Sequence, residues 1–152
     1  MQIKIHIRPF RVTDLNQVAQ LFDGYRQFYK EPADLDLAHQ YISDRISKNE
    51  STILVAENQL GALVGFSQLY PTFCSVIAKP IFVLYDLFVS PASRGTGVAQ
   101  QLLDAAVVLA KEQGKARLDL TTAKSNLKAQ SVYEANGWNR DHNFYTYYYS
   151  ID

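Results

Sequence analysis

The segment Leu84–Leu103 constrains the fold of this chain more than any other part of its sequence. It reads LYDLFVSPASRGTGVAQQLL, an apolar strand followed by a short loop, a turn with two glycines and the start of a helix. The unpaired amides and the dipole at a helix start attract an anion. Gly95 and Gly97 lack a Cβ atom, so a phosphate can approach the backbone, and Arg94 has a side chain suited to phosphate oxygens. The sequence therefore predicts a phosphate-binding site at residues 94–99.

Length, charge and cysteine content limit the classes of protein to which the chain can belong. Its 152 residues suit one domain, 1–152, and its fifteen basic residues balance fifteen acidic ones, which argues against a nucleic-acid or polybasic membrane partner. No apolar run reaches the ~20 residues of a membrane span, and the N-terminus has no signal-peptide core. Cys74 is the single cysteine, so nothing indicates an oxidising compartment, and we expect the cytoplasm.

The hydrophobic pattern predicts strands and helices along the whole chain. The expected strands are Ile3–Arg8, with Ile3, Ile5 and Ile7 on its buried face and Lys4, His6 and Arg8 opposite, Ser51–Ala56, Ala62–Tyr70, Ile81–Val89, Ala116–Leu120, a region that begins at Trp138, and Phe144–Ser150. The expected helices are one that begins after Thr13 or Asp14 and weakens or bends at Gly24, and those at about Asp34–Lys48, Gly97–Gln113 and Asn126–Asn136. Pro71–Lys79 is expected to be a loop. This order predicts an α/β domain with a mixed central sheet of about seven strands and about four flanking helices.

Two common glycine-rich motifs do not fit the turn at Gly95. A P-loop needs Gly-x-x-x-x-Gly-Lys-Ser/Thr, which the chain lacks. The dinucleotide-binding fingerprint needs a third glycine where Gln100 stands, and the loop Val89–Gly95 is too long for its tight turn. An NAD(P)-dependent oxidoreductase is therefore disfavoured.

The pattern that remains is Arg-x-x-Gly-x-Ala at Arg94–Ala99, and it resembles the GCN5-related N-acetyltransferase (GNAT) family. In that family Arg/Gln-x-x-Gly-x-Gly/Ala is the loop whose amides hold the pyrophosphate of acetyl-coenzyme A (acetyl-CoA). Asp86–Val89 looks like the family's fourth strand, and Asn126 and Tyr133 match the Asn-x6-Tyr of its last major helix. Tyr133–Trp138 looks like the family's Tyr-Glu-x-x-Gly-Phe/Trp ending. The resemblance covers essentially the whole chain and implies a single GNAT-type domain with N-acetyltransferase activity.

The resemblance implies acetyl-CoA as the cofactor. The loop amides would hold its pyrophosphate, to which Arg94 would add charge. The strand backbone would pair with the pantetheine arm, and an amide near Phe88 would face the thioester oxygen as an oxyanion donor. Asn126 would cap its helix and bond the arm, and either role alone would explain it. The cofactor residues implied are Leu87, Phe88, Val89, Arg94, Gly95, Thr96, Gly97, Val98, Ala99, Asn126 and Tyr133.

Two residues, Tyr133 and Asp86, are expected to take part in the chemistry. Tyr133 would protonate the leaving thiolate, although a tyrosine at this helical position also packs well with its hydroxyl at the rim. The acceptor must attack as a free amine, and the candidates that would remove or relay its proton are Asp86, Tyr85 or water held by them. Asp86 stands out as an acid inside an apolar run, and its role would be this proton transfer or binding of the acceptor. A structural salt bridge or a turn contact is the alternative for Asp86. His6, His39 and His142 lack the spacing of a metal site, and we expect none.

The acceptor is expected beside an aromatic cluster, because aromatic faces and a carboxylate suit a cationic amine. The residues are Tyr25, Phe28, Tyr29, Tyr85 and Asp86, and helix packing is the alternative for the aromatic ones on the helix. The cluster resembles small-amine acetyltransferases of the polyamine and thialysine type. We therefore expect a small primary amine, such as a polyamine, an amino acid or an amino-sugar derivative, that attacks directly in a ternary complex. A protein lysine or N-terminus is the second candidate. A non-enzymatic acyl-CoA-binding module is the third, and Tyr133 argues against it.

The segment Phe144–Tyr149 is rich in aromatic residues for an exposed strand. Such an edge is usually covered or paired, and aromatic residues are enriched at interfaces. We therefore expect a homodimer through this strand, with burial inside one chain as the alternative.

Overall fold

The computed structural model describes residues 4–152, which form two compact units, residues 4–120 and residues 121–152. Ile3, which the sequence places in the first strand, lies outside the described residues. Within residues 4–152, no helix is long and apolar enough to cross a membrane.

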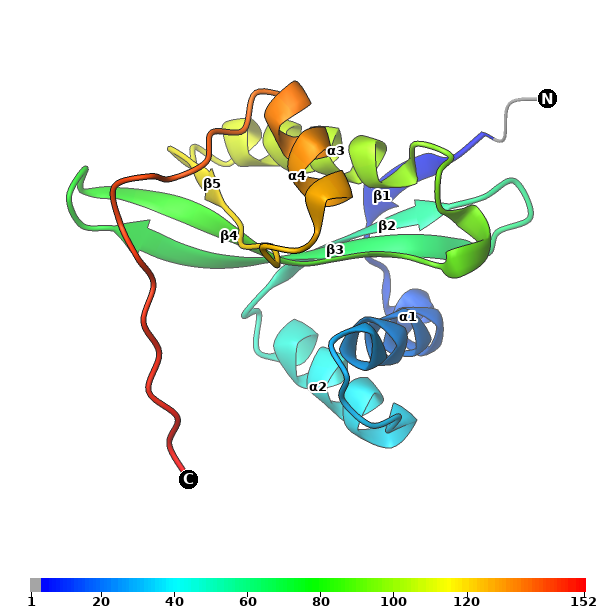
Figure 1. The fold of residues 1–152 in the computed structure, drawn as a ribbon. Coiled ribbons are helices and arrows are strands. Elements are labelled where there is room, and N and C mark those ends of the chain that lie inside the picture. The colour runs from blue at the N-terminus through cyan, green and yellow to red at the C-terminus, as the bar shows by residue number, and fades with distance from the viewer. Residues whose placement is uncertain (1–3) are drawn as a thin grey trace. The chain divides into compact units, whose positions relative to one another are not determined.

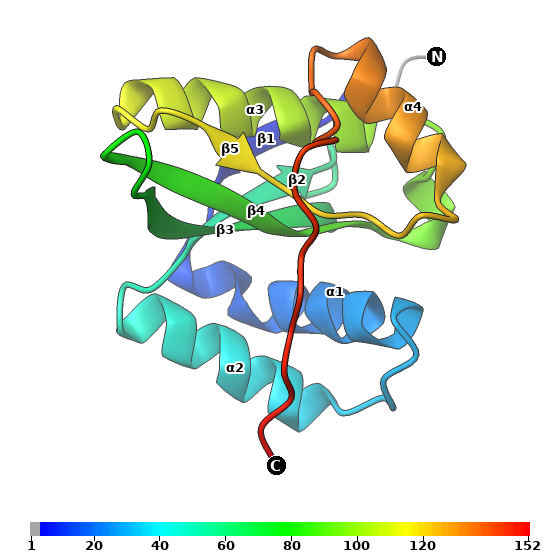
Figure 2. The same cartoon turned by 60° about the vertical axis from the view of Figure 1, so that its left-hand side comes forward.

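The first unit is a mixed β-sheet with helices on both faces (Figures 1 and 2). Its strands, in spatial order, are β1 (His6–Pro9), β2 (Thr52–Glu57), β3 (Leu63–Cys74), β4 (Lys79–Val89) and β5 (Leu118–Asp119). The first four pair antiparallel, whereas β5 runs parallel to β4. Helices α1 (Leu15–Phe28) and α2 (Leu35–Ser47) cover one face, and α3 (Val98–Glu112) covers the other.

The ends of α2 and α3 follow from local sequence signals. Asp34 caps α2, because its side chain accepts a hydrogen bond from the Leu37 amide at 3.0 Å. Helix α3 begins after Gly97, where φ is 85°, and is followed by Gly114, where φ is 69°. Both backbone angles favour glycine. The observed ends of α2 and α3 lie within two residues of the predicted ones, which confirms the prediction.

Two apolar layers hold the sheet between the helices. The layer under α1 and α2 includes Phe22, Ile42 and Phe66, and the layer under α3 includes Leu102 and Leu103, all of them buried. Full burial of one such side chain contributes about 1.5–3 kcal/mol. These layers therefore fix the sheet on which the candidate site lies.

The sequence predicted that the first helix weakens or bends at Gly24. This prediction is wrong, because α1 continues without interruption to Phe28. A Cβ atom at Gly24 would lie 3.0 Å from the ring of Phe88. The glycine therefore allows close packing of α1 on β4.

The predicted loop Pro71–Lys79 is wrong. Strand β3 continues to Cys74 and β4 begins at Lys79, so the two form one long hairpin that closes with a hydrogen bond from the Ala78 amide to the Ser75 carbonyl at 3.1 Å. Pairing with β2 ends at Leu69, which makes the rest of β3 an edge strand on that side. Pro71 is tolerated there because a proline suits an edge.

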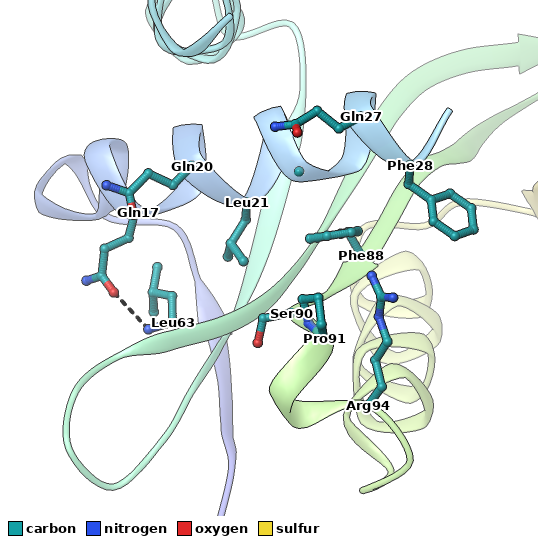
Figure 3. A pocket seen from close by; sticks show the side chains of 11 residues that line it. Gln17, Gln20, Leu21, Gln27, Phe28, Leu63, Phe88, Ser90, Pro91 and Arg94 are labelled. Atoms are coloured by element: carbon teal, nitrogen blue, oxygen red, sulfur yellow. Dashed lines mark hydrogen bonds between the residues drawn. The ribbon is translucent and has the colours of Figure 1, made fainter. Parts of the chain in front are cut away.

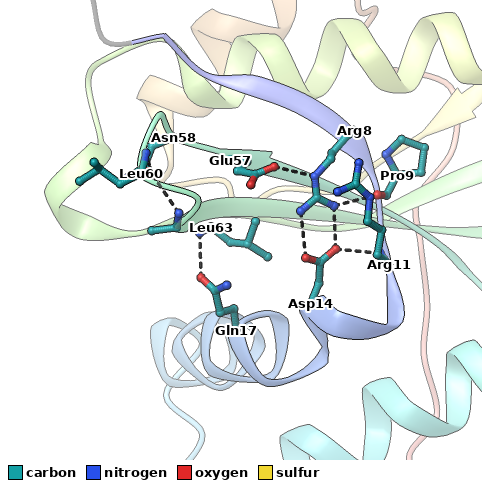
Figure 4. A network of polar contacts seen from close by, with 10 residues as sticks. Arg8, Pro9, Arg11, Asp14, Gln17, Glu57, Asn58, Leu60 and Leu63 are labelled. Atoms are coloured by element: carbon teal, nitrogen blue, oxygen red, sulfur yellow. Dashed lines mark hydrogen bonds and ion pairs between the residues drawn. The ribbon is translucent and has the colours of Figure 1, made fainter.

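The first strand departs from the predicted alternation at Arg8. Its side chain was expected on the exposed face, yet Arg8 is only 7% exposed. Its guanidinium donates to both carboxylate oxygens of Asp14, at 2.7 and 2.9 Å, and its Nε donates to Glu57 at 2.6 Å (Figure 4). Asp14 also accepts from the Arg11 amide at 2.7 Å. The burial of Arg8 is thus explained by two carboxylates from distant segments, which periodicity does not reveal.

The second unit contains α4 (Leu127–Ala135) and the C-terminal segment. Asn126 caps α4 as predicted, because its side chain accepts from the Ala129 amide at 3.1 Å. The strands predicted from Trp138 and at Phe144–Ser150 are wrong, since residues 138–152 form no strand. The sheet of the described chain therefore has five strands rather than about seven, while the α/β class, the mixed sheet and the four helices are confirmed. Aromatic residues favour strands, but they do not supply the neighbouring backbone that a strand needs.

Candidate active site

The candidate site is built around a β-bulge in β4. Gln68 of β3 lies opposite Asp86, whereas the next residue, Leu69, lies opposite Leu84. Tyr85 is therefore an extra residue in β4, and such a bulge redirects the side chains around it. Tyr85 is 65% exposed, whereas the neighbouring Asp86 is 2% exposed.

Asp86 is a buried carboxylate without a cationic partner among residues 4–152. The Gln68 amide donates to its Oδ2 atom at 2.6 Å, and the Gln68 carbonyl accepts from the Ser51 hydroxyl at 2.8 Å. Burial raises the pKa of Asp86 to about 6, while hydrogen bonds from Gln68 and Tyr25 act in the opposite direction. At neutral pH this group is an ionised carboxylate that accepts a proton more readily than an exposed one. The salt bridge that the sequence left open is absent from the described chain.

Four of the five predicted acceptor residues gather at the bulge. The Tyr25 hydroxyl donates to the carbonyl of Tyr85 at 3.1 Å, which joins the end of α1 to β4. The ring of Tyr29 lies 5.1 Å from that of Tyr25. Burial first and the charge of Asp86 second raise the pKa values of Tyr25 and Tyr29, so both phenols stay protonated. The ring of Phe28 lies 5.2 Å from that of Tyr29 and also lines the pocket described below (Figure 3).

Sequence reasoning missed the polar neighbours of Asp86 on β3 and α2. The Tyr41 and Tyr70 hydroxyls lie 2.6 Å apart, and the ring of Tyr70 lies 5.7 Å from that of Tyr85. Burial, followed by the hydrogen bond with Tyr41, raises the pKa of Tyr70. The sequence could have indicated Gln68 in the same way as Asp86, because each is a polar residue inside an apolar strand.

The edge of β4 beyond the bulge is free of pairing with β5. That pairing covers only Phe82 and Val83. On the other side of β4, the Ser90 amide donates to the Val64 carbonyl of β3 at 2.8 Å. Amides alternate along a strand, so the Leu87 and Val89 amides face the free edge, whereas the Phe88 amide faces β3.

The loop before α3 has the shape of an anion site. Gly95 and Gly97 have φ angles of 78° and 85°, and no atom lies within 4 Å of the position that a Cβ would take at either. The Thr96 hydroxyl bonds the Ser93 carbonyl within the loop. The first amides of α3 have no acceptor within the helix. The loop therefore fits a pyrophosphate that the backbone binds.

The Arg94 side chain packs against β4 and the end of α1 rather than against this loop. Its Nε donates to the Val89 carbonyl at 2.9 Å, and its guanidinium carbon lies 5.2 Å from the ring centre of Phe88 and 5.9 Å from that of Phe28. Figure 3 shows the guanidinium beside these two rings, under the end of α1. Arg94 thus lines a pocket of about 530 Å³ between α1 and the end of β4.

The remaining predicted site residues lie in the second unit. Asn126 is half-buried at the start of α4, with its side-chain oxygen bound to the Ala129 amide. Tyr133 is half-buried, its ring centre is 6.1 Å from that of Trp138, and its carbonyl accepts from the Trp138 amide at 3.1 Å. Its catalytic role stays a prediction.

Comparisons with known proteins agree with this geometry. The model of the acetyltransferase (GNAT) family matches residues 15–138. The chain is 43% identical to the uncharacterized N-acetyltransferase YhfO of Bacillus subtilis (strain 168), a match that covers 94% of this chain and 95% of that protein. A crystal structure of a probable acetyltransferase has a TM-score of 0.90 at 32% identity and covers 97% of this chain and 98% of its own. The aminoglycoside N-acetyltransferase AAC(6')-Iy, solved in complex with CoA, shares the fold at 19% identity with a TM-score of 0.82, covering 99% of this chain and 98% of its own.

The family match confirms two predictions made from the sequence. GNAT acetyltransferases use acetyl-CoA, and the loop at Gly95 and Gly97 fits its pyrophosphate, so the predicted cofactor is confirmed. The relative at 43% identity bears an N-acetyltransferase name, which agrees with the predicted class of enzyme. The chain therefore belongs to the GNAT acetyltransferase family and is an N-acetyltransferase.

Proposed function

We propose that the protein transfers the acetyl group of acetyl-CoA to a primary amine of a small molecule, by direct attack in a ternary complex. The observation that supports this proposal best is Asp86, a buried carboxylate with no cationic partner in the described chain. Burying an unpaired charge is costly, and a cationic amine is the partner that this carboxylate lacks.

The loop before α3 and the free edge of β4 hold the cofactor in this proposal. Acetyl-CoA supplies an activated acetyl thioester. The Leu87 and Val89 amides bind along the free edge, and one of them is the oxyanion donor. The Phe88 amide, which faces β3, does not take that role. The amides that bind the pyrophosphate are those of Gly95, Thr96, Gly97, Val98 and Ala99.

Asp86 prepares the acceptor. An alkylamine has a pKa of about 10, so it arrives as an ammonium ion. The carboxylate attracts this ion and accepts or relays a proton, so that the nitrogen lone pair becomes free to attack. Tyr25 hydrogen-bonds the Tyr85 carbonyl, which holds the bulge, and the rings of Tyr25, Tyr29 and Tyr85 offer their faces to the cation.

Tyr133 and Asn126 complete the proposed machinery. Tyr133 protonates the leaving sulfur as general acid, and Asn126 adds a hydrogen bond to the pantetheine arm. These two roles rest on the match of both residues to the Asn-x6-Tyr pattern of the family.

A thiol-release assay with acetyl-CoA and a panel of small amines tests the function. We expect turnover with at least one small primary amine, and a lower kcat for Tyr133→Phe with acetyl-CoA affinity nearly unchanged. A Tyr133→Phe variant with full kcat would show that the general acid is another group. Stabilisation of the protein by NADH but not by CoA, in a thermal-shift experiment, would overturn the cofactor assignment. Turnover with peptides alone would move the acceptor class to proteins.

We also propose a cytoplasmic homodimer formed through the C-terminal segment. The side chains of Phe144 and Tyr148 are 80% and 92% exposed, and an aromatic surface of this kind is typical of an interface. Light scattering at micromolar concentration tests the proposal, and a monomer there would remove it.

A further inference from the structure

The pocket between α1 and the end of β4 has a composition unlike that of a cation site. Eleven residues line it, and none of them is Asp or Glu. The polar ones are Gln17, Gln20, Gln27, Ser90 and Arg94. Arg94 gives the pocket a positive formal charge.

Hydrogen bonds inside the protein decide which groups of the pocket are left for a ligand. The Gln17 carbonyl accepts from the Leu63 amide at 2.9 Å (Figure 3), which leaves the NH₂ donors of this side chain. The Nε atom of Arg94 is bound to the Val89 carbonyl, which leaves its two terminal nitrogens. Ser90 adds a hydroxyl, and the Gln20 amide can donate as well. Gln27 donates its NH₂ to Asp23 at 3.0 Å, which leaves its carbonyl as an acceptor, yet donors still outnumber acceptors around the one charged group.

A carboxylate matches this set of donors better than other common groups. A guanidinium binds a carboxylate with two parallel hydrogen bonds, and amide or hydroxyl donors satisfy its remaining lone pairs. The rings of Phe28 and Phe88 fix the position of the guanidinium. A second ammonium group would meet Arg94 with no carboxylate among the lining residues to offset the repulsion.

The distance between this pocket and Asp86 limits the length of the ligand. Phe88 and Asp86 are two residues apart on β4, and both lie opposite even-numbered β3 residues, Phe66 and Gln68, so they share one face of the sheet. Two residues of a strand span about 7 Å. The Arg94 guanidinium lies a further 5.2 Å from the ring centre of Phe88, so a ligand that reaches both charges must be a chain of several bonds, and the acceptor series below determines how many.

We infer that the acceptor is an ω-amino carboxylate, whose amine binds at Asp86 and whose carboxylate binds at Arg94 with Gln17 and Ser90. This inference rests on the proposed function and narrows its substrate class. It excludes a polyamine as the preferred acceptor, because the second ammonium group of a polyamine would lie against Arg94.

Acceptors matched in length test the inference. The kcat/KM values of 6-aminohexanoate, hexylamine and 1,6-diaminohexane are compared, together with ω-amino carboxylates that are one or two methylenes shorter or longer. We expect at least one amino carboxylate to exceed the alkylamine of its length by about tenfold or more, the contribution of a charge-assisted hydrogen-bond pair. The diamine is expected to be the poorest of its length.

Two variants assign this preference to the pocket. Arg94→Gln should reduce the ratio of kcat/KM between amino carboxylate and alkylamine to near one, whatever its effect on acetyl-CoA. Gln20→Glu adds a carboxylate to the pocket and should shift the preference towards the diamine. Far-ultraviolet circular dichroism verifies that both variants are folded.

The outcomes separate this inference from the proposed function. Turnover of all amines with equal kcat/KM, or a preference that Arg94→Gln leaves intact, would overturn the inference and keep the function. A diamine preferred by the unaltered protein would do the same. No turnover with any small amine would overturn the proposed function, and the inference with it.

Discussion

Two carboxylates of this protein are almost equally buried and yet have opposite surroundings. Asp14 is 4% exposed and Asp86 is 2% exposed. The guanidinium of Arg8 and the Arg11 amide bind Asp14, and hydrogen bonding to Arg8 lowers its pKa. Asp86 has no cationic partner among residues 4–152, and burial raises its pKa to about 6. Burial alone therefore does not indicate a functional acid, whereas burial without a charged partner does.

The difference separates a structural site from a candidate chemical one. The Arg8–Asp14 pair satisfies its own charges and connects β1 to the start of α1 (Figure 4). Asp86 keeps an unsatisfied charge that a substrate can pair. A protein with such a site is less stable than it could be, because optimal stability and a reactive group conflict.

The largest expected effect is on activity at Asp86. Asp86→Asn removes the proton acceptor and should lower kcat/KM by about 10²- to 10⁴-fold, the usual range for a general base. In the unaltered protein the carboxylate must be ionised, so kcat/KM should fall as the pH drops below about 6. A pH profile of the thiol-release rate checks both statements. If the variant kept the same decrease below about pH 6, another group would be the base.

The next largest effect is expected on the free energy of unfolding, when Asp14 loses its partner Arg8. Arg8→Met leaves Asp14 buried without its cation and should lower the free energy of unfolding by about 3–5 kcal/mol. Urea unfolding measures the loss. The matched control is Arg8→Met with Asp14→Leu, which removes both charges of this pair, leaves the more exposed Glu57 without Arg8, and should recover part of the loss. A single variant within 1 kcal/mol of the unaltered protein would mean that the pair is not structural.

Removing the charge of Asp86 is expected to raise the free energy of unfolding, whereas removing that of Arg8 lowers it. In the unfolded chain this carboxyl ionises near pH 4, whereas in the folded protein it ionises at about 6, so its burial costs stability once the pH exceeds both values. Asp86→Asn should therefore stabilise the protein by about 3 kcal/mol at most at pH 8, and the gain should disappear as the pH falls from 6 to 4. Thermal unfolding at several pH values measures it. A pH-independent difference would contradict this origin.

The smallest effect concerns Gln68. Its amide donates to Asp86 and holds the pKa of that carboxyl down, so Gln68→Leu should raise this pKa. The decrease of kcat/KM at low pH should begin at a higher pH, by less than one pH unit, because one hydrogen bond contributes about 1 kcal/mol. An unchanged pH profile would show that Gln68 has only a packing role.

Features set by neighbouring residues could be predicted from the sequence, and features set by distant ones could not. Asp34, Gly97 and Gly114 fix helix ends through their own backbone or side chain, so the bounds of α2 and α3 were accessible. The burial of Arg8 depends on Glu57, which lies 49 positions away.

The same limit applies to the candidate site. Asp86 stands out as an acid in an apolar run, but its partner Gln68, 18 positions earlier, is identified only by the register of the hairpin. The side chain of Arg94 is a similar case. The motif predicts that Arg94 contacts a phosphate, whereas in the structure its guanidinium packs against the rings of Phe28 and Phe88.

The bulge at Tyr85 makes the protein sensitive to a change that substitutions do not test. Gln68 and Leu69 are neighbours, yet their partners Asp86 and Leu84 are two positions apart. Loss of one codon here would restore a regular ladder, which needs no special residue to fold. The shortened sheet would persist without the carbonyl that binds Tyr25. A single deletion in β4 would thus remove the bulge and keep the pairing of β3 with β4 on either side of it.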